Sequence, residues 1–364
     1  MLSRRVYIDW GRGLAVLVMI QAHTFDSWTR AADKRSLPFR DAQIVSGFAA
    51  PLFLWLAGVA LALAATRATR ANGRAAAVDT ICRRGLEIFL LAFLFRLQAF
   101  IVSPGSYPVS LFRVDILNIM GPAIFAAGLA WALAESTAGL VVMYAALATG
   151  VAMVTPIIRT TTLVDALPLW VTWYIRPAGD YNTFQMFPWA GFVFAGAACG
   201  TLVAVAERAT EERRLHAWLV VTGAALFALG WYTSLQPTIY RQASFWTTSP
   251  TWFAIRLGVM MIAFSVLFSL SRLATRYNVT CQPLARFGRS SLFVYWIHVE
   301  LVYGYATWLW RGRLPFLGTV GAFVLFSAAM YGAVVLRDRV VDSALWRLPK
   351  LPGARKTLEM TSDG

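Results

Sequence analysis

Residues 5–28 read RVYIDWGRGLAVLVMIQAHTFDSW, an apolar stretch that carries four ionisable side chains after its first residue. As an α-helix, this stretch is long enough to cross the hydrocarbon layer of a membrane. Arg12 and His23 lie eleven residues apart. They therefore project within about 20° of each other, with roughly 16 Å of axial rise between them. Asp9 and Asp26 lie one turn outside that pair, which places all four side chains on one face.

Ionisable groups inside a membrane are costly, and they normally face the protein interior or a water-filled cavity. The polar face therefore predicts that this side of the helix lines a functional site inside the protein. Its candidate catalytic residues are Asp9, Arg12, His23 and Asp26. The alternative is that the residues near the start of the helix anchor it at the membrane interface and that those near its end belong to an ordinary helix terminus. This helix alone favours neither reading.

The whole chain has the composition of a polytopic helical membrane protein. Of its 364 residues, 58% are hydrophobic and 14% are charged, and the mean hydropathy is +0.59. Apolar runs that can cross a bilayer fall at residues 11–28, 44–65, 85–101, 116–134, 137–156, 187–206, 215–235, 252–270, 290–310 and 316–336. We therefore expect an all-α bundle of about ten transmembrane helices. The short apolar segment 160–175 would raise the number to eleven if it inserts, and otherwise it is re-entrant or interfacial.

The net charge of +15 does not indicate a nucleic-acid partner, because most basic residues lie between apolar runs. With ten spans both termini share one side, and that side carries about twice as many basic residues as the other. Both termini are thus expected in the cytoplasm. Four arginines on that side suit a polyanionic ligand, although topology alone would also explain them: Arg83, Arg84, Arg286 and Arg289. None of the three cysteines has zinc-site spacing, so no metal site is expected.

A second polar helix is expected at residues 286–310, RFGRSSLFVYWIHVELVYGYATWLW. Ser291, Tyr295 and His298 follow i, i+4 and i+7 spacing, which places them on one face. Glu300 points nearly the opposite way and needs a polar partner inside the membrane. A single histidine in a membrane is more often a buried hydrogen-bonding group than a catalyst.

Two shorter motifs concern helix ends and helix packing. In FRVDILNIMGP, residues 112–122, Asp115 can cap a helix, whereas Asn118 one turn later needs a polar neighbour. In FPWAGFVFAGAACG, residues 187–200, the small-xxx-small spacing predicts a close helix-packing face.

The first polar helix resembles the start of integral-membrane acyltransferases. In these proteins an acid precedes Arg-Gly, and ten residues separate that arginine from a histidine. The matching positions here are Asp9, Arg12, Gly13 and His23.

The second polar helix is similar to the late G-x-x-S-x-x-x-Y-x-x-H helix of the same superfamily, which includes acyltransferase family 3. Its matching positions are Gly288, Ser291, Tyr295 and His298. With PLFLWLAGVALAL (51–63), DILNIMGPA (115–123) and residues 187–200, these helices most resemble bacterial members of the heparan-alpha-glucosaminide N-acetyltransferase family. The resemblance runs from about Arg5 to Leu336.

The resemblance implies acetyl transfer from cytoplasmic acetyl-CoA to a sugar or cell-envelope glycan on or near the outer face. It implies an O- or N-acetyltransferase in a bacterial inner membrane, surrounded by the lipid bilayer and compatible with a homo-oligomer. Residues 1–340 would form one transmembrane acyltransferase domain, followed by a basic cytoplasmic tail, residues 341–364. Lysosomal members use a histidine in the loop after the first helix, and TRAADKRSLPFRD, residues 29–41, contains none. This departure puts in doubt both an acetyl-histidine step in that loop and a glucosamine acceptor, so the acceptor stays open.

On this interpretation His23 is the general base, or a transient acetyl acceptor, and Asp26 orients its ring. The expected acetyl-CoA ligands are Arg12, Arg83, Arg84, Arg286 and Arg289. The expected acceptor ligands are Asp115, Asn118, Tyr295 and His298.

Two other classes of function suit the same residues. A secondary transporter or flippase for an amphipathic substrate would also place charges in a polar interior. The chain shows no evident internal duplication, which many transporters have. A non-catalytic membrane partner of a cell-envelope enzyme is the third reading.

Overall fold

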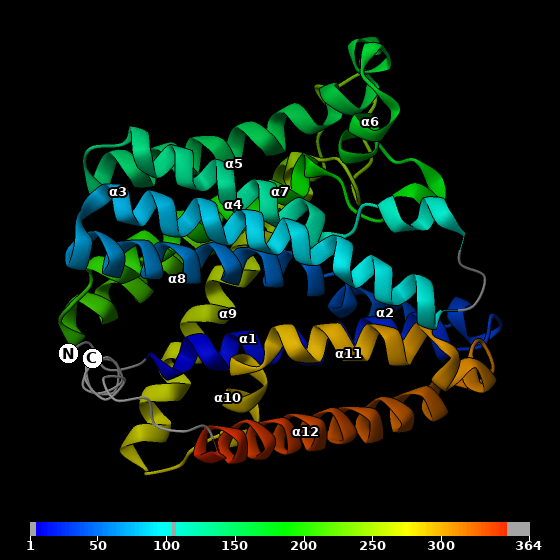
Figure 1. Cartoon of the computed structure of the whole chain (residues 1–364). Helices are drawn as coiled ribbons and strands as arrows, with labels where there is room; N and C mark the ends of the chain where they lie inside the picture. The colour runs from blue at the N-terminus through cyan, green and yellow to red at the C-terminus, as the bar shows by residue number, and fades with distance from the viewer. Residues whose placement is uncertain (1–4, 104–106, 348–364) are drawn as a thin grey trace.

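The computed structural model describes residues 5–103 and 107–347, with side chains to residue 343. The described chain is helical, without a β-strand and with two isolated bridges. Its α-helices are α1 (Val6–Trp28), α2 (Leu37–Ser46), α3 (Ala49–Val102), α4 (Ile116–Leu133), α5 (Thr137–Thr160), α6 (Leu169–Ile175), α7 (Met186–Val205), α8 (Ala209–Ser234), α9 (Pro250–Arg276), α10 (Gln282–Arg289), α11 (Ser291–Tyr303) and α12 (Phe316–Arg347). Short 3₁₀ turns at Asp33–Arg35, Pro108–Phe112, Thr162–Ala166, Gly179–Tyr181 and Tyr305–Trp310 connect them. Figure 1 shows the arrangement.

Helix α3 is a hairpin of two helical arms. Its 54 residues are interrupted at Gly73, whose φ of 83° is not helical. Glycine adopts this left-handed conformation readily because it has no β-carbon. The arms, residues 49–72 and 74–102, run in opposite directions from that point (Figure 1). The expected run 44–65 is divided between two helices, because its first residues belong to α2, which ends at Ser46, and the rest belong to the first arm of α3.

Seven segments of the described chain are long and apolar enough to cross a membrane, which characterises the chain as an integral membrane protein. One of them, Leu37–Val102, contains α2 and both arms of α3. The polar helices α1 and α11 are outside the seven, and α11 has only 13 residues. The number ten therefore stays a prediction. Segment 160–175 forms a 3₁₀ turn and the seven-residue α6, which is too short to cross.

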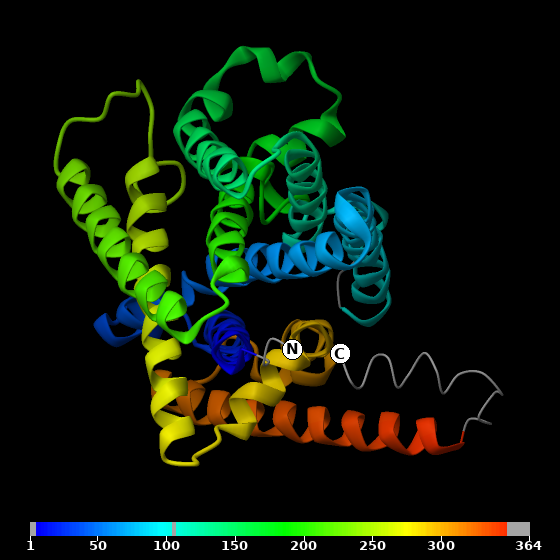
Figure 2. The same cartoon turned by 90° about the vertical axis from the view of Figure 1, so that its left-hand side faces the viewer.

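Helix α7 lies at the centre of one half of the bundle, where most of it is buried against α3 and α5. A β-carbon added at Gly196 would overlap the Trp55 carbonyl oxygen of α3. The close packing predicted for residues 187–200 is therefore confirmed. Helices α8 and α9 form a pair at the edge of the molecule (Figure 2).

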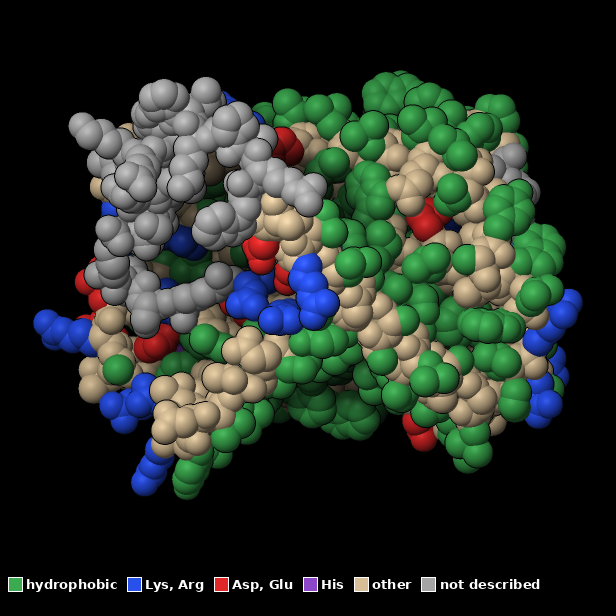
Figure 3. Space-filling model, turned by 60° about the horizontal axis from the view of Figure 1, so that its bottom comes forward, with side chains coloured by type: hydrophobic (Ala, Val, Ile, Leu, Met, Phe, Trp, Pro, Cys, Tyr) green, Lys and Arg blue, Asp and Glu red, His purple; other side chains and the backbone are tan. Residues whose placement is uncertain are grey.

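The other half is built around α1, which contacts α10, α11 and α12. The first turn of α1 and the end of α12 lie at the same end of the bundle (Figure 1). Because α12 continues to Arg347, the expected domain boundary at residue 340 falls inside a helix. The rest of the expected tail, residues 348–364, lies outside the described residues. In Figure 3 hydrophobic side chains cover much of the right half of the face, and Lys and Arg side chains lie at the left, near the centre and along the right margin.

Candidate active site

Two cavities lie along α1 and α11. The first, here called the histidine cavity, has a volume of about 710 Å³. Its lining includes Met19, His23, Asp26, Phe53, Phe95, Arg96, Arg113, Asp115, Tyr295, Glu300, Tyr303 and Arg311. The second, here called the arginine cavity, has a volume of about 510 Å³ and includes Arg12, Phe53, Asp79, Arg83, Arg84, Glu87 and Ser291.

An aromatic cluster stands between the cavities. The Phe53 side chain lines both of them. Its ring stacks on Tyr295 with centroids 6.0 Å apart, and Tyr295 in turn lies 5.2 Å from the ring of Phe95. A ligand that occupied both cavities would therefore have to pass Phe53.

The polar faces of α1 and α11 meet beside each cavity. In the arginine cavity, Nη2 of Arg12 donates a hydrogen bond to Oγ of Ser291 over 3.0 Å. Next to the histidine cavity, Nδ1 of His23 lies 2.9 Å from Nε2 of His298. The two helices singled out by the sequence are thus partners, which neither helix predicts by itself.

Two glycines let α1 approach α10 closely. A β-carbon added at Gly13 would overlap the Leu284 carbonyl oxygen, and one added at Gly288 would overlap the Asp9 carbonyl oxygen. Both glycines belong to the motifs quoted above. Asp9 is buried at this crossing and does not line either cavity. Asp9 therefore lies where α1 packs against α10, and its catalytic role stays a prediction.

The contacts of the histidine pair define the position of each ring proton. His298 is fully buried, and its Nδ1 lies 2.7 Å from the Val294 carbonyl oxygen. A carbonyl oxygen only accepts, so this Nδ1 carries the proton. In a neutral ring, Nε2 of His298 is then an acceptor, and Nδ1–H of His23 donates to it. In the neutral form of His23, the proton is then on Nδ1, and Nε2 is the nitrogen available as a base.

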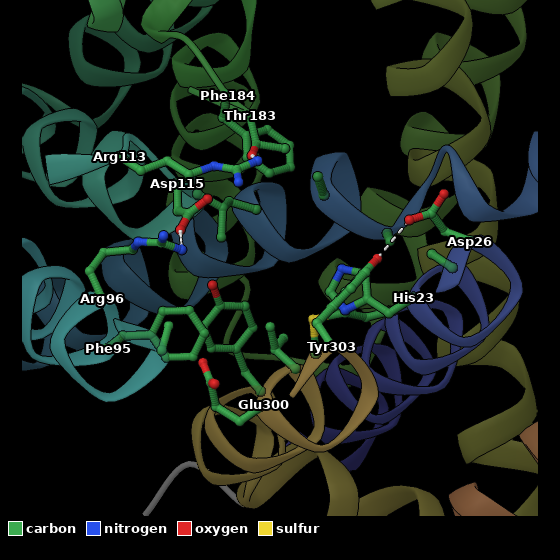
Figure 4. Close-up of a pocket in the computed structure, with 18 of the residues that line it drawn as sticks. His23, Asp26, Phe95, Arg96, Arg113, Asp115, Thr183, Phe184, Glu300 and Tyr303 are labelled. Carbon is green, nitrogen blue, oxygen red and sulfur yellow. Dashed lines mark hydrogen bonds and ion pairs between the residues drawn. The ribbon is translucent and has the colours of Figure 1, made fainter. Parts of the chain in front are cut away.

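Asp26 does not orient His23 by a hydrogen bond of its own. It accepts one from the Tyr303 hydroxyl over 2.9 Å, as Figure 4 shows, and lies 3.7 Å from Nζ of Lys34. The Tyr303 ring packs edge-on against the His23 ring at 5.5 Å. The hydrogen-bonding partner of His23 is His298, so the tautomer is set from α11 rather than from Asp26.

The expected acceptor residues divide into two groups. Asp115 and Tyr295 line the histidine cavity. Asn118 does not, because its Oδ1 accepts from the backbone N–H of Asp115 over 3.0 Å at the start of α4. This contact gives the Asn118 oxygen a polar partner, whereas its buried Nδ2 has no hydrogen-bond partner among the described residues. His298 lies behind His23 and is not among the lining residues.

Several polar residues of the histidine cavity were not among the expected site residues. Arg96 forms an ion pair with Asp115 over 3.0 Å, and Oγ of Ser103 donates to Glu300 over 3.4 Å. Figure 4 shows Glu300 at the opposite wall from Arg113. The sequence could indicate Glu300, because a carboxyl group inside an apolar helix needs a polar neighbour. It could not indicate Arg113 in the same way, because this arginine lies in a loop between helices.

The arginine cavity contains three of the five expected donor ligands, Arg12, Arg83 and Arg84. Arg83 pairs with Asp79 over 3.1 Å, and Arg84 pairs with Glu87 over 3.0 Å. Both pairs are at least half exposed, so the guanidinium groups retain donors for a ligand.

The other two expected ligands, Arg286 and Arg289, lie in the last turn of α10 and do not line this cavity. Within residues 5–103 and 107–347, no group of three or more His, Cys, Asp or Glu side chains is placed to hold a metal ion.

Comparison with known proteins identifies the family. No curated protein matches the chain. The family model described as heparan-alpha-glucosaminide N-acetyltransferase, catalytic, matches residues 4–237. That match includes α1, α3 and α4, which line both cavities, and ends before α11. The chain therefore belongs to the heparan-alpha-glucosaminide N-acetyltransferase family of acetyltransferases.

Proposed function

We propose that this protein transfers an acetyl group from cytoplasmic acetyl-CoA to a hydroxyl or amine of a sugar or glycan on or near the outer face of the membrane. The family and the presence of two adjoining cavities with different chemistry support this proposal. The arginine cavity suits the donor, and the histidine cavity suits the acceptor and the reacting groups.

The donor would bind with its phosphates in the arginine cavity. Arg12, Arg83 and Arg84 can make charge-assisted hydrogen bonds to phosphate oxygens. The rise of α1 from Arg12 to His23 is roughly 16 Å, a span suited to a slender and extended arm. The pantetheine arm would pass Phe53 and present the thioester in the histidine cavity.

The His23–His298 pair is the observation that carries the chemical part of the proposal. It leaves Nε2 of His23 as the unprotonated nitrogen of a side chain that lines the cavity. As the acceptor oxygen or nitrogen attacks the thioester carbonyl, Nε2 takes its proton. The new carbon–oxygen or carbon–nitrogen bond forms, the carbon–sulfur bond breaks, and the CoA thiolate takes the proton from the imidazolium. His298 holds the ring in this orientation throughout.

The direct test is acetyl transfer by the His23→Asn variant. Purified protein in nanodiscs would be supplied with radiolabelled acetyl-CoA and a panel of amino sugars and envelope glycans. We expect transfer to fall by at least roughly 10²-fold, the effect of losing a general base, while acetyl-CoA affinity stays near normal. His216→Asn is the matched control, because the His216 side chain lies outside both cavities.

Full transfer activity in the His23→Asn protein at saturating acetyl-CoA would remove the base from this mechanism. A wild-type protein that neither binds nor hydrolyses acetyl-CoA, but moves an amphipathic substrate between the faces of a vesicle, would instead identify a transporter.

A further inference from the structure

A groove between α8 and α9 lies apart from both cavities. The two helices pack against each other at the edge of the bundle (Figure 2). The groove has a volume of about 1070 Å³ and lies where α8 begins and α9 ends. Its lining includes Arg213, Arg272 and Arg276 together with Val220, Val266 and Leu273. It thus combines three cations with an apolar wall.

The three arginines are not neutralised by acids of the protein. All three side chains are exposed, and in the described part of the chain none forms an ion pair. Nearby acids are already paired with other arginines: Glu207 with Arg70, Glu211 with Arg208 and Glu212 with Arg5. Three uncompensated cations in one groove favour an external anion.

The surroundings of the groove indicate which anion it meets. Val220, Val266 and Leu273 are 40%, 49% and 50% exposed, so they present an apolar surface beside the cations. This end of α8 is joined to the residue that precedes α1 by the Arg5–Glu212 ion pair. The basic asymmetry of the loops assigns that end to the cytoplasmic leaflet, where acidic lipids attract arginines.

We propose that this groove binds one acidic phospholipid. Its phosphate lies among Arg213, Arg272 and Arg276, and an acyl chain runs along Val220 and Val266. The geometry does not involve the acetyl-transfer residues, so the site stands independently of the proposed function. The family match ends at residue 237, before α9, so the matched segment does not contain both walls of this groove.

A second groove on the same helix pair provides an internal comparison. It has a volume of about 850 Å³, is shared with α5 and α7, and runs along α8 from Leu215 to Ser234. Its described lining residues include no Arg, Lys, Asp or Glu. It would accept acyl chains without a preference for acidic headgroups.

The test is lipid binding to the delipidated full chain, measured by native mass spectrometry. Phosphatidylglycerol and phosphatidylcholine with identical acyl chains would be titrated separately and in competition. We expect one phosphatidylglycerol molecule that phosphatidylcholine does not displace. The triple variant R213Q, R272Q and R276Q should lose roughly 10- to 100-fold in phosphatidylglycerol affinity and keep its phosphatidylcholine binding.

The matched control removes the same charge elsewhere. The variant R35Q, R40Q and R241Q changes three exposed arginines outside the groove and should keep the phosphatidylglycerol molecule. The triple lysine variant at the groove positions keeps the charge and should bind within a few-fold of wild type. If the glutamine variant does not yield a monodisperse protein, phosphatidylglycerol binding by the lysine variant remains as a test of the site.

Three results would overturn the proposal. One is equal retention of phosphatidylglycerol by the glutamine variant. Another is a loss of phosphatidylglycerol affinity in the lysine variant that is as large as the loss in the glutamine variant. The third is displacement of the lipid by inorganic phosphate alone, which would identify a site for a free anion.

Discussion

Nδ1 of His23 lies 2.9 Å from Nε2 of His298, although 275 positions separate the two residues along the chain. This contact joins the first polar helix to the second at the wall of the histidine cavity. Because Nδ1 of His298 is committed to the Val294 carbonyl, the direction of both hydrogen bonds is defined. The pair therefore determines which nitrogen of His23 is available to a substrate.

Substituting His298 tests this arrangement. His298→Ala removes the acceptor for Nδ1–H of His23, so both tautomers and other ring orientations become available. We expect kcat to fall by roughly 10- to 100-fold with little change in donor KM, because His298 acts through His23. His298→Gln supplies a carbonyl oxygen that can accept from Nδ1–H, and it should restore part of the activity.

Nitrogen-15 NMR of histidine-labelled protein would report the tautomer directly. Wild type should show His23 protonated at Nδ1, and His298→Ala should show a mixture. A single, unchanged His23 tautomer in His298→Ala would contradict the positioning role.

Charge removal in the arginine cavity should weaken donor binding. Arg83→Ala with Arg84→Ala removes two guanidinium groups that line the cavity. We expect the binding free energy of acetyl-CoA to become less favourable by about 1 to 3 kcal/mol, measured by calorimetry on the folded variant. The control is Arg286→Ala with Arg289→Ala, which removes the same charge outside the cavity. Equal losses in the two double variants would mean that only overall charge matters.

The close crossing of α1 and α10 should be sensitive to one added carbon. Gly13→Ala and Gly288→Ala each place a β-carbon against a backbone carbonyl oxygen. We expect each to lower the free energy of unfolding by about 1 to 3 kcal/mol, as overpacking does, and to lower Tm. Gly150→Ala, in α5, has no atom within 4 Å of the added carbon and should not lower Tm. Equal Tm values for all three variants would contradict the crossing.

The orientation in the membrane can be tested with single cysteines on a variant that lacks Cys82, Cys199 and Cys281. Thr238→Cys and Asn72→Cys both introduce exposed thiols. The basic asymmetry predicts that an impermeant maleimide added outside spheroplasts labels position 238 and not position 72. The opposite labelling would place the arginine cavity on the outer side, away from cytoplasmic acetyl-CoA.

The sequence by itself determined the helical character of the chain and the local pattern on each helix. The spacing of Arg12 and His23 on α1, and of Ser291 and His298 on α11, follows from 3.6 residues per turn. The small residues of 187–200 identify a packing face for the same reason. These features are local, because a helix satisfies its backbone hydrogen bonds within one segment.

Only the tertiary structure decided which polar faces meet. Helix periodicity does not say that His23 contacts His298, that Asp26 accepts from Tyr303, or that Arg96 pairs with Asp115. Nor does it say that Arg286 and Arg289 lie outside the lining of the cavity that holds Arg83 and Arg84. These contacts depend on the order and crossing of helices distant in the chain. That order comes from side-chain packing between helices, which no single segment contains.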